Sequence, residues 1–147
     1  VPGRSDGEKI TNSVAWAQDY QGGRYLPDIL IGAARYFHRR ANYSGAIGLV
    51  DRYLEQYKEA GDRLLILKAM CLSQRNDGQG ARAVLDLVEK GYADSGLVPQ
   101  VAFLRGWTYL NEQKTSEART AFEELVARYP KDAFSEKAKR ILESLKK

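Results

Sequence analysis

The stretch from residue 98 to residue 130 constrains the fold of this chain more than any other. It contains two amphipathic segments joined by a short polar turn, VPQVAFLRGWTYLN and TSEARTAFEELVARYP. Gly106 and Ala118 are small residues, one in each segment, and they are followed by the aromatic residues Tyr109 and Phe122. Antiparallel helices approach closely only where small side chains meet, and Pro130 cannot continue a helix. The stretch therefore predicts a tight helical hairpin that ends at Pro130.

The same pattern occurs twice more, upstream of this hairpin. Ala46, Ala81 and Ala118 are separated by 35 and 37 residues, and each lies in a similar second segment. The small residues of the first segments follow the same period: Ala34, Ala69 and Gly106. We expect Asp62 and Thr115 to cap helices within these units, because short polar side chains accept hydrogen bonds from free helical N–H groups.

These residues resemble the tetratricopeptide repeat (TPR) family, whose pattern is W-x2-L-G-x2-Y, then A-x3-F, then P, in about 34 residues. Five places of the pattern are filled: Gly106, Tyr109, Ala118, Phe122 and Pro130. Two places depart from it, with Ala102 in place of the Trp and Arg105 in place of the Leu. The resemblance implies an all-α fold, an α-solenoid of three TPR-like helical hairpins with a concave surface lined by the first helices.

We predict a single TPR domain over residues 7–147, with eight helices and no strand, after a disordered or remnant segment 1–6. The predicted segments are an N-terminal helix 7–21, repeats at 27–60, 62–92 and 98–130, and a capping helix 132–146. In the first repeat the second helix is expected to cover 44–59. Terminal repeats have outer faces without neighbours, so we expect helix 7–21 to cap the first repeat. The alternative is that it occupies the groove of a neighbouring chain.

Composition excludes several classes of function. The chain has one histidine, one cysteine and no second ligand at metal spacing, so we expect no zinc site, no cofactor and no enzyme. The net charge is +4, and the one basic cluster, Arg35 to Arg40, lacks elements that read nucleic acid, so no nucleic-acid partner is predicted. No apolar run reaches the roughly 18 residues of a transmembrane helix, so we expect no direct membrane insertion.

The ending YPKDAFSEKAKRILESLKK carries a second resemblance. Together with the hairpin before it, this ending looks like the capping turn of bacterial cell-envelope TPR proteins. These are of the type of the Tol-associated coordinator and the outer-membrane assembly lipoprotein. The resemblance implies a periplasmic or cell-envelope protein rather than a cytoplasmic one. The sequence starts at Val1 without a signal peptide, and we expect either a fragment of a longer chain or a mature form whose leader has been removed.

The predicted concave groove is a candidate binding site for a protein segment. Positions next to the small residues, and three before them, should point into it, and basic residues lie near the first repeat. The predicted groove residues are Ile31, Arg35, His38, Arg39, Arg63, Ile66, Met70, Phe103 and Trp107. The alternative for Phe103 and Trp107 is burial under the capping helix. Aromatic, methionine and arginine side chains are typical of protein interfaces.

The groove predicts a scaffold or adaptor whose partner is a protein or peptide segment with apolar anchors and at least one Asp or Glu. Its arginines would favour an acidic residue and raise the association rate. The alternative function is structural, a self-assembling homo-oligomeric TPR protein. The sequence leaves the partner and the oligomeric state open.

Overall fold

The computed structural model describes residues 26–56 and 58–146, and this part of the chain is helical without any strand. Its α-helices are α2 (Leu26–Arg39), α3 (Tyr43–Tyr53), α4 (Gly61–Gln74), α5 (Gly78–Gly91), α6 (Val98–Asn111), α7 (Thr115–Arg128) and α8 (Ala133–Leu145). A short 3-10 helix, η2 (Lys58–Ala60), precedes α4. The eighth predicted helix, 7–21, and the predicted disordered segment 1–6 lie outside the described residues.

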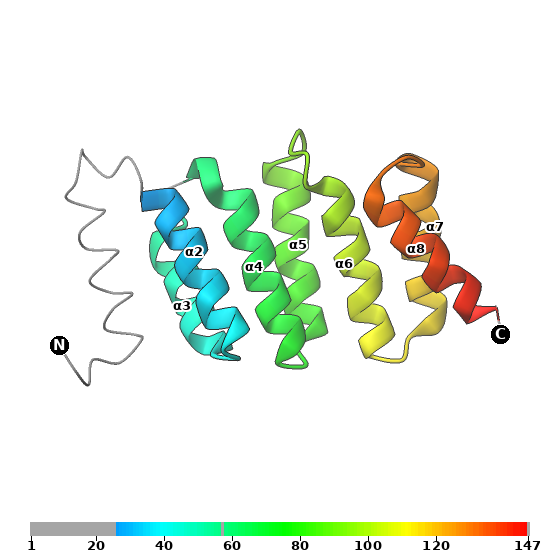
Figure 1. The fold of residues 1–147 in the computed structure, drawn as a ribbon, viewed down its shortest axis with the longest axis horizontal. Helices are drawn as coiled ribbons and strands as arrows, with labels where there is room; N and C mark the ends of the chain where they lie inside the picture. The colour runs from blue at the N-terminus through cyan, green and yellow to red at the C-terminus, as the bar shows by residue number, and fades with distance from the viewer. Residues whose placement is uncertain (1–25, 57, 147) are drawn as a thin grey trace.

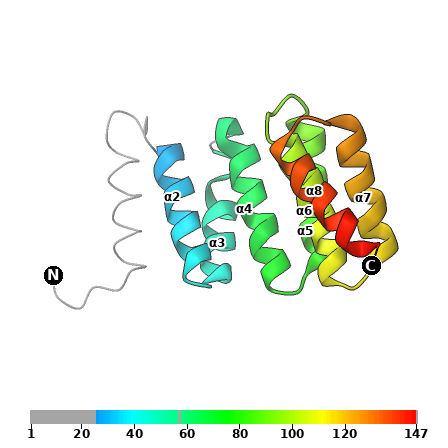
Figure 2. The same ribbon diagram turned by 45° about the vertical axis from the view of Figure 1, so that its right-hand side comes forward.

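The helices form three hairpins stacked side by side and closed by α8 (Figure 1). Helices α2, α4 and α6 run parallel and form one face, and α3, α5 and α7 form the second layer. The view in Figure 2 shows α8 crossing the last hairpin, where it contacts both α6 and α7. This architecture confirms the prediction of an all-α solenoid of helical hairpins.

The turn inside each hairpin has the same backbone geometry. Ala41, Asn76 and Gln113 adopt left-handed φ values of 58°, 63° and 61°. After each of them the next N–H donates to a carbonyl five residues earlier, as when Asn42 N donates to Phe37 O at 2.8 Å. This bonding closes the last turn of the first helix. The three positions recur at the 35- and 37-residue intervals of the sequence pattern, so the backbone repeats with the sequence.

Two helices begin differently from the prediction. Helix α4 starts at Gly61, so Asp62 is its second residue and its carboxylate accepts from Arg63 N and from Ser95 Oγ. Helix α7 starts at Thr115, and the capping position holds Lys114, which has no acceptor in its side chain. The predicted caps Asp62 and Thr115 are therefore wrong, because each lies inside its helix. Asn42, Asp77 and Asp132 cap α3, α5 and α8.

The second helix of the first repeat is shorter than the predicted 44–59. Helix α3 ends at Tyr53, and the chain enters α4 through η2. A residue from the next hairpin holds this connection, since Tyr92 Oη donates to the carbonyl of Lys58 at 2.8 Å. The tyrosine also lies directly against Gly61, where any Cβ would collide with its hydroxyl. The connection into α4 is therefore held by a contact from 34 residues away in sequence, which periodicity could not indicate.

The core follows the small residues of the repeat pattern. Ala34, Ala46, Ala81 and Ala118 are 0–1 % exposed, and each lies where the two helices of a hairpin cross. Three apolar clusters surround these crossings and join neighbouring hairpins. Burial of this kind contributes roughly 25 cal/mol per Å² of apolar surface, so the stack of hairpins stabilises each of its members.

Candidate functional site

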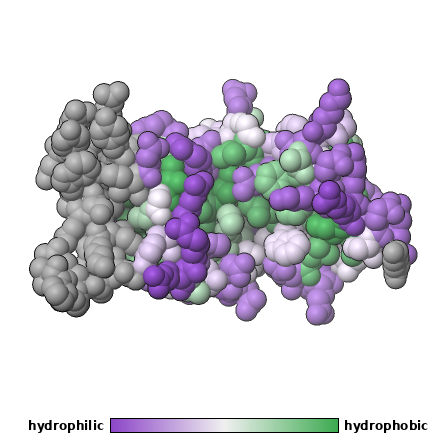
Figure 3. Space-filling model, viewed as in Figure 1, coloured by the Kyte–Doolittle hydropathy of each residue, from purple (hydrophilic) through white to green (hydrophobic). Residues whose placement is uncertain are grey.

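The face formed by α2, α4 and α6, here called the first-helix face, carries a cleft of about 280 Å³. We call it the basic cleft. Its lining comes from all three helices and the turn before α6: Arg35, His38, Arg39, Arg63, Ile66, Leu67, Met70, Leu97 and Gln100. Figure 3 shows apolar surface over the middle of this face, bordered by hydrophilic side chains. The structure therefore brings six of the nine predicted groove residues together in one depression.

The rim of the basic cleft has an excess of positive charge. Arg35 and Arg39 are exposed, and neither forms an ion pair with any residue in the described ranges. Arg63 faces Asp28 at 3.9 Å, with both side chains largely in solvent. An exposed pair at this distance contributes little free energy, and salt screens it. The guanidinium groups are therefore available to an anionic group that enters the cleft.

His38 lies in the wall of the cleft. Its imidazole packs on the ring of Tyr43 with the centroids 5.7 Å apart. Its Nε2 atom is buried and has no hydrogen-bond partner among residues 26–56 and 58–146. A buried polar atom without a partner costs roughly 1–3 kcal/mol, so this wall of the cleft is polar but unsatisfied.

The apolar floor of the cleft is shallower than the sequence suggested. Ile66 is 3 % exposed and Leu67 is 7 % exposed, whereas Met70 remains partly exposed. Ile31 is 4 % exposed and packs into the core with Leu30, so it offers no surface to a partner. This corrects its predicted place in the groove. The side chain lies on the α2 side that the neighbouring helices cover, rather than on the outer face.

Phe103 and Trp107 do not line the basic cleft. They stack on each other along α6, with centroids 6.3 Å apart and ring planes 17° apart. The ring of Phe103 packs against Phe122 of α7 and Phe134 of α8, with ring centroids 5.6 and 5.4 Å apart, respectively. Trp107 remains 41 % exposed. The predicted burial under the closing helix therefore applies to one side of Phe103, whereas Trp107 keeps a free surface.

Four residues of this surface were not among the predicted groove residues. Leu67, Leu97 and Gln100 line the basic cleft, and Phe134 supports Phe103. Gln100 lies seven residues before Trp107, so helical periodicity could have placed both on one face of α6. No sequence signal assigned Phe134 to this face, because its contact depends on how α8 crosses α6.

The described residues offer little for catalysis. They contain no group of three or more His, Cys, Asp or Glu side chains that could hold a metal ion. Cys71 is fully buried, and burial raises the pKa of its thiol to about 11. A thiol in that state is a poor nucleophile near neutral pH, because the thiolate is the reactive form.

A family model described as an outer membrane lipoprotein, YfiO, matches residues 8–147 of the chain. The chain belongs to the YfiO family of outer membrane lipoproteins. No curated protein matches it. The family match confirms the resemblance to bacterial cell-envelope proteins with helical repeats. It also confirms the predicted location in the cell envelope over the cytoplasm.

The YfiO family is of a helical scaffold type, and membership supports a protein-interaction role in the envelope. Within the described ranges of this YfiO-family chain, no helix has the length and apolar character needed to cross a bilayer. The first-helix face of this chain carries both the basic cleft and the exposed Trp107.

Proposed function

We propose that this chain is an interaction scaffold of the cell envelope that holds an acidic, apolar-anchored segment of a partner protein in the basic cleft. The observation that supports this proposal is the presence, above an apolar floor, of two exposed arginines, Arg35 and Arg39, that form no ion pair with any described residue. A carboxylate of the partner would neutralise this rim. An apolar side chain beside it would contact Met70, the partly exposed residue of the floor.

Each part of the cleft has a separate energetic task. Exposed charges contribute roughly 0.2–1 kcal/mol each and mainly raise the association rate. The apolar floor would supply most of the affinity, because burial of methyl and methylene groups is worth about 0.8 kcal/mol per CH₂ group. Met70 suits such a floor, since its flexible thioether adapts to side chains of different shapes.

Selection of peptides from a random 12-residue library on the purified full chain tests this function. The enriched peptides should contain Asp or Glu next to Leu, Ile, Val or Phe. Replacing both Arg35 and Arg39 by Ser should weaken their binding by about 1–2 kcal/mol, and the difference should shrink at high salt. A matched control, Lys90→Ser with Lys131→Ser, makes the same charge change at exposed residues outside the cleft. Peptides without acidic enrichment, or equal losses in both double variants, would contradict the proposal.

Self-assembly remains the alternative prediction from the sequence. Light scattering over a range of concentrations separates the two functions, because a monomeric scaffold keeps one mass while a self-assembling protein gains mass with concentration.

A further inference from the structure

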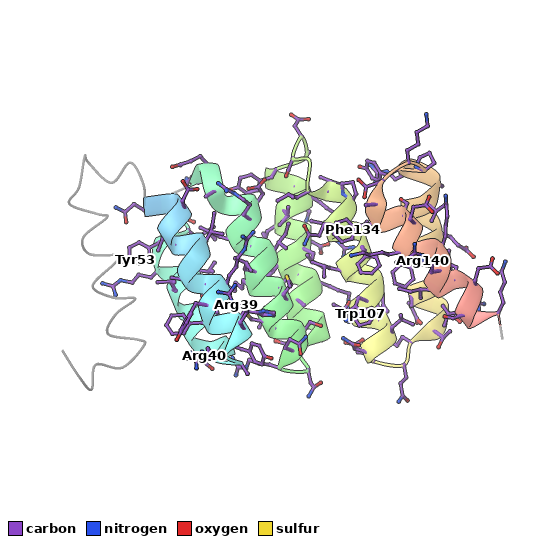
Figure 4. The ribbon with its side chains drawn as sticks, viewed as in Figure 1. Arg39, Arg40, Tyr53, Trp107, Phe134 and Arg140 are labelled. Carbon is purple, nitrogen blue, oxygen red and sulfur yellow. The ribbon has the colours of Figure 1, made fainter. Side chains whose placement is uncertain are left out.

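The second exposed feature of the first-helix face is an aromatic group on α6 and α8, which we call the aromatic platform. It consists of Phe103, Trp107 and Phe134. Figure 4 labels Trp107 and Phe134 near the α6–α8 end of the face, and Arg39 on α2 at the other end. We infer that the platform is a second subsite for the same partner, and that it takes an apolar or aromatic side chain six residues from the acidic one. This inference rests on the proposed function.

The platform has the properties of an anchor site. Trp107 exposes 41 % of its surface, and its ring runs nearly parallel to that of Phe103, with the centroids 6.3 Å apart. Phe103 is held by Phe122, which is fully buried, and by Phe134. A rigidly supported tryptophan loses little conformational freedom on binding, and such residues dominate the binding energy of protein interfaces. An incoming aromatic ring would find a preformed stacking surface.

The platform lies on the same face as the basic cleft. Gln100 lines the cleft, and Trp107 is two helical turns further along α6 on the same side. The C-terminal end of α6 also contacts α4, where Asn111 Nδ2 donates to Ser73 Oγ at 3.4 Å. A single segment can therefore cross from the cleft to the platform without leaving this face.

The repeat geometry gives the length of that segment. Arg35, Met70 and Trp107 follow the small residues of their helices at the same position, so they occupy equivalent repeat positions on α2, α4 and α6. Directly packed helices are about 8–10 Å apart, and α6 approaches α4 less closely than α4 approaches α2, so the two spacings together amount to roughly 20 Å. An extended chain advances about 3.3 Å per residue, and six residues cover this distance. An even number also places both side chains on the same side of the segment.

An extended segment fits better than a helix. The cleft of about 280 Å³ has room for a few side chains of an extended segment but is too small to hold a whole helix. A helix with its side chains is about 10–12 Å wide and advances only 1.5 Å per residue, so it would need roughly 11–13 residues for the same distance. The inference therefore commits to an extended partner with an acidic residue at position i and an aromatic or large apolar residue at i+6 or i−6.

A series of synthetic peptides tests the spacing. Each peptide carries one Asp-Leu pair and one Phe, with Phe four, five, six, seven or twelve residues away from Asp along the chain, in both orders. We expect the tightest binding at six, with at least fivefold weaker binding at five and seven, as measured by fluorescence anisotropy with the full chain. Equal affinity across the series, or a maximum at twelve, would overturn the inference.

Variants of the platform separate this inference from the proposed function. Trp107→Ala should weaken the six-spaced peptide about tenfold or more and leave a peptide with Asp-Leu alone unchanged. Leu87→Ala is the matched control, because Leu87 is 54 % exposed but lies on α5. If Trp107→Ala lowers the melting temperature, Trp107→Leu keeps an apolar side chain on Phe103 and should still lose affinity for the Phe of the peptide.

The outcomes of the two proposals differ. One outcome is that replacing Arg35 and Arg39 by Ser weakens the binding of both the six-spaced peptide and the Asp-Leu peptide, while both Trp107 variants bind them like the parent. The platform is then not a subsite, and the proposed function stands. If neither set of variants changes the affinity, both proposals fail.

Discussion

Gly106 of α6 lies directly against the ring of Phe122 on α7. A Cβ at position 106 would be 2.6 Å from Cε1 of Phe122 and 2.8 Å from two further ring carbons. Phe122 is fully buried at the centre of the third core cluster and also touches Phe103 of the aromatic platform. The glycine therefore allows the close crossing of α6 and α7. Through the contact between Phe122 and Phe103, this crossing also supports the aromatic platform.

Gly106→Ala should destabilise the protein in spite of the better helix propensity of alanine. The gain in propensity is about 0.8–1.0 kcal/mol, whereas overpacking costs about 1–3 kcal/mol. We expect a net loss on the order of 1 kcal/mol in the free energy of unfolding, measured with urea. Gly48→Ala on α3 is the control, because nothing lies within 4 Å of its added Cβ, and it should stabilise. Equal effects of the two substitutions would contradict this account of the crossing.

Lys114→Asn should add the helix cap that the third hairpin lacks. Lys114 has φ −90° and ψ 74°, close to the −89° and 70° of Asn42, whose side chain accepts from Gly45 N. An asparagine at position 114 would meet the equivalent free N–H at the start of α7 and stabilise by about 0.5–1 kcal/mol. Lys114→Ala is the comparison, because it removes the 3.2 Å pair with Glu112 without adding an acceptor. Thermal denaturation should rank the asparagine variant above both the parent and the alanine variant.

Arg82 should be the most sensitive charged residue between the second and third hairpins. Its guanidinium donates to Thr108 Oγ1 at 3.0 Å and to both carboxylate oxygens of Glu112 at 3.1 Å. It also lies 4.2 Å from the centroid of the Tyr109 ring. Arg82→Ala should lower the free energy of unfolding by about 2–3 kcal/mol. Arg82→Lys should restore only part of this loss, because lysine has a single side-chain nitrogen and cannot bind Thr108 and Glu112 with two separate ones as Arg82 does. Arg119→Ala, at an exposed position on α7, should change stability by less than about 0.5 kcal/mol.

The same ion pair should make stability depend on acid pH. The hydrogen bond from Arg82 holds the pKa of the Glu112 carboxyl below its ordinary value. The contribution is therefore fully present above the unfolded pKa, about 4.3, and is lost as the pH falls through the lower folded pKa. Glu112→Gln should flatten the decline of the unfolding free energy below about pH 4.3. An unchanged decline would show that other carboxylates dominate acid unfolding.

Cys71 should resist thiol reagents in the folded protein. Burial raises the pKa of its thiol to about 11, so little thiolate is present at neutral pH, and the sulfur is not exposed. We expect the aromatic disulfide reagent DTNB to react only as fast as the protein opens, and to react at once in denaturant. Because the folded protein holds the Cys71 thiol proton more tightly than the unfolded chain does, the free energy of unfolding should fall once the pH exceeds the pKa of the unfolded thiol. This decline should continue as the pH rises toward 11. Rapid labelling of the native protein would show that α4 opens locally.

The sequence by itself determined the repeating architecture. Hydrophobic periodicity and small residues such as Ala34, Ala81 and Ala118 are local signals, because a helix buries one face and a hairpin needs small residues at its crossing. Their 35- and 37-residue spacing was enough to predict three hairpins and a closing helix, and even the left-handed turn residues follow it. Three residues of the basic cleft, Arg35, Ile66 and Met70, were predictable for the same reason, since each occupies a repeat-equivalent position on a first helix. The other three predicted residues of the cleft, His38, Arg39 and Arg63, were placed there because they are basic residues close to these positions or at the start of a first helix.

Only the tertiary structure decided which of those positions are exposed and which meet. Ile31 and Phe103 have similar positions in their repeats, yet Ile31 is buried in the core while Phe103 supports an exposed tryptophan. The connection into α4 is held by Tyr92 at the end of α5, and the platform depends on Phe134 of α8. These contacts join residues more than 25 positions apart, and their distances follow from how whole helices pack. Periodicity carries no information about that packing, because it describes one helix at a time.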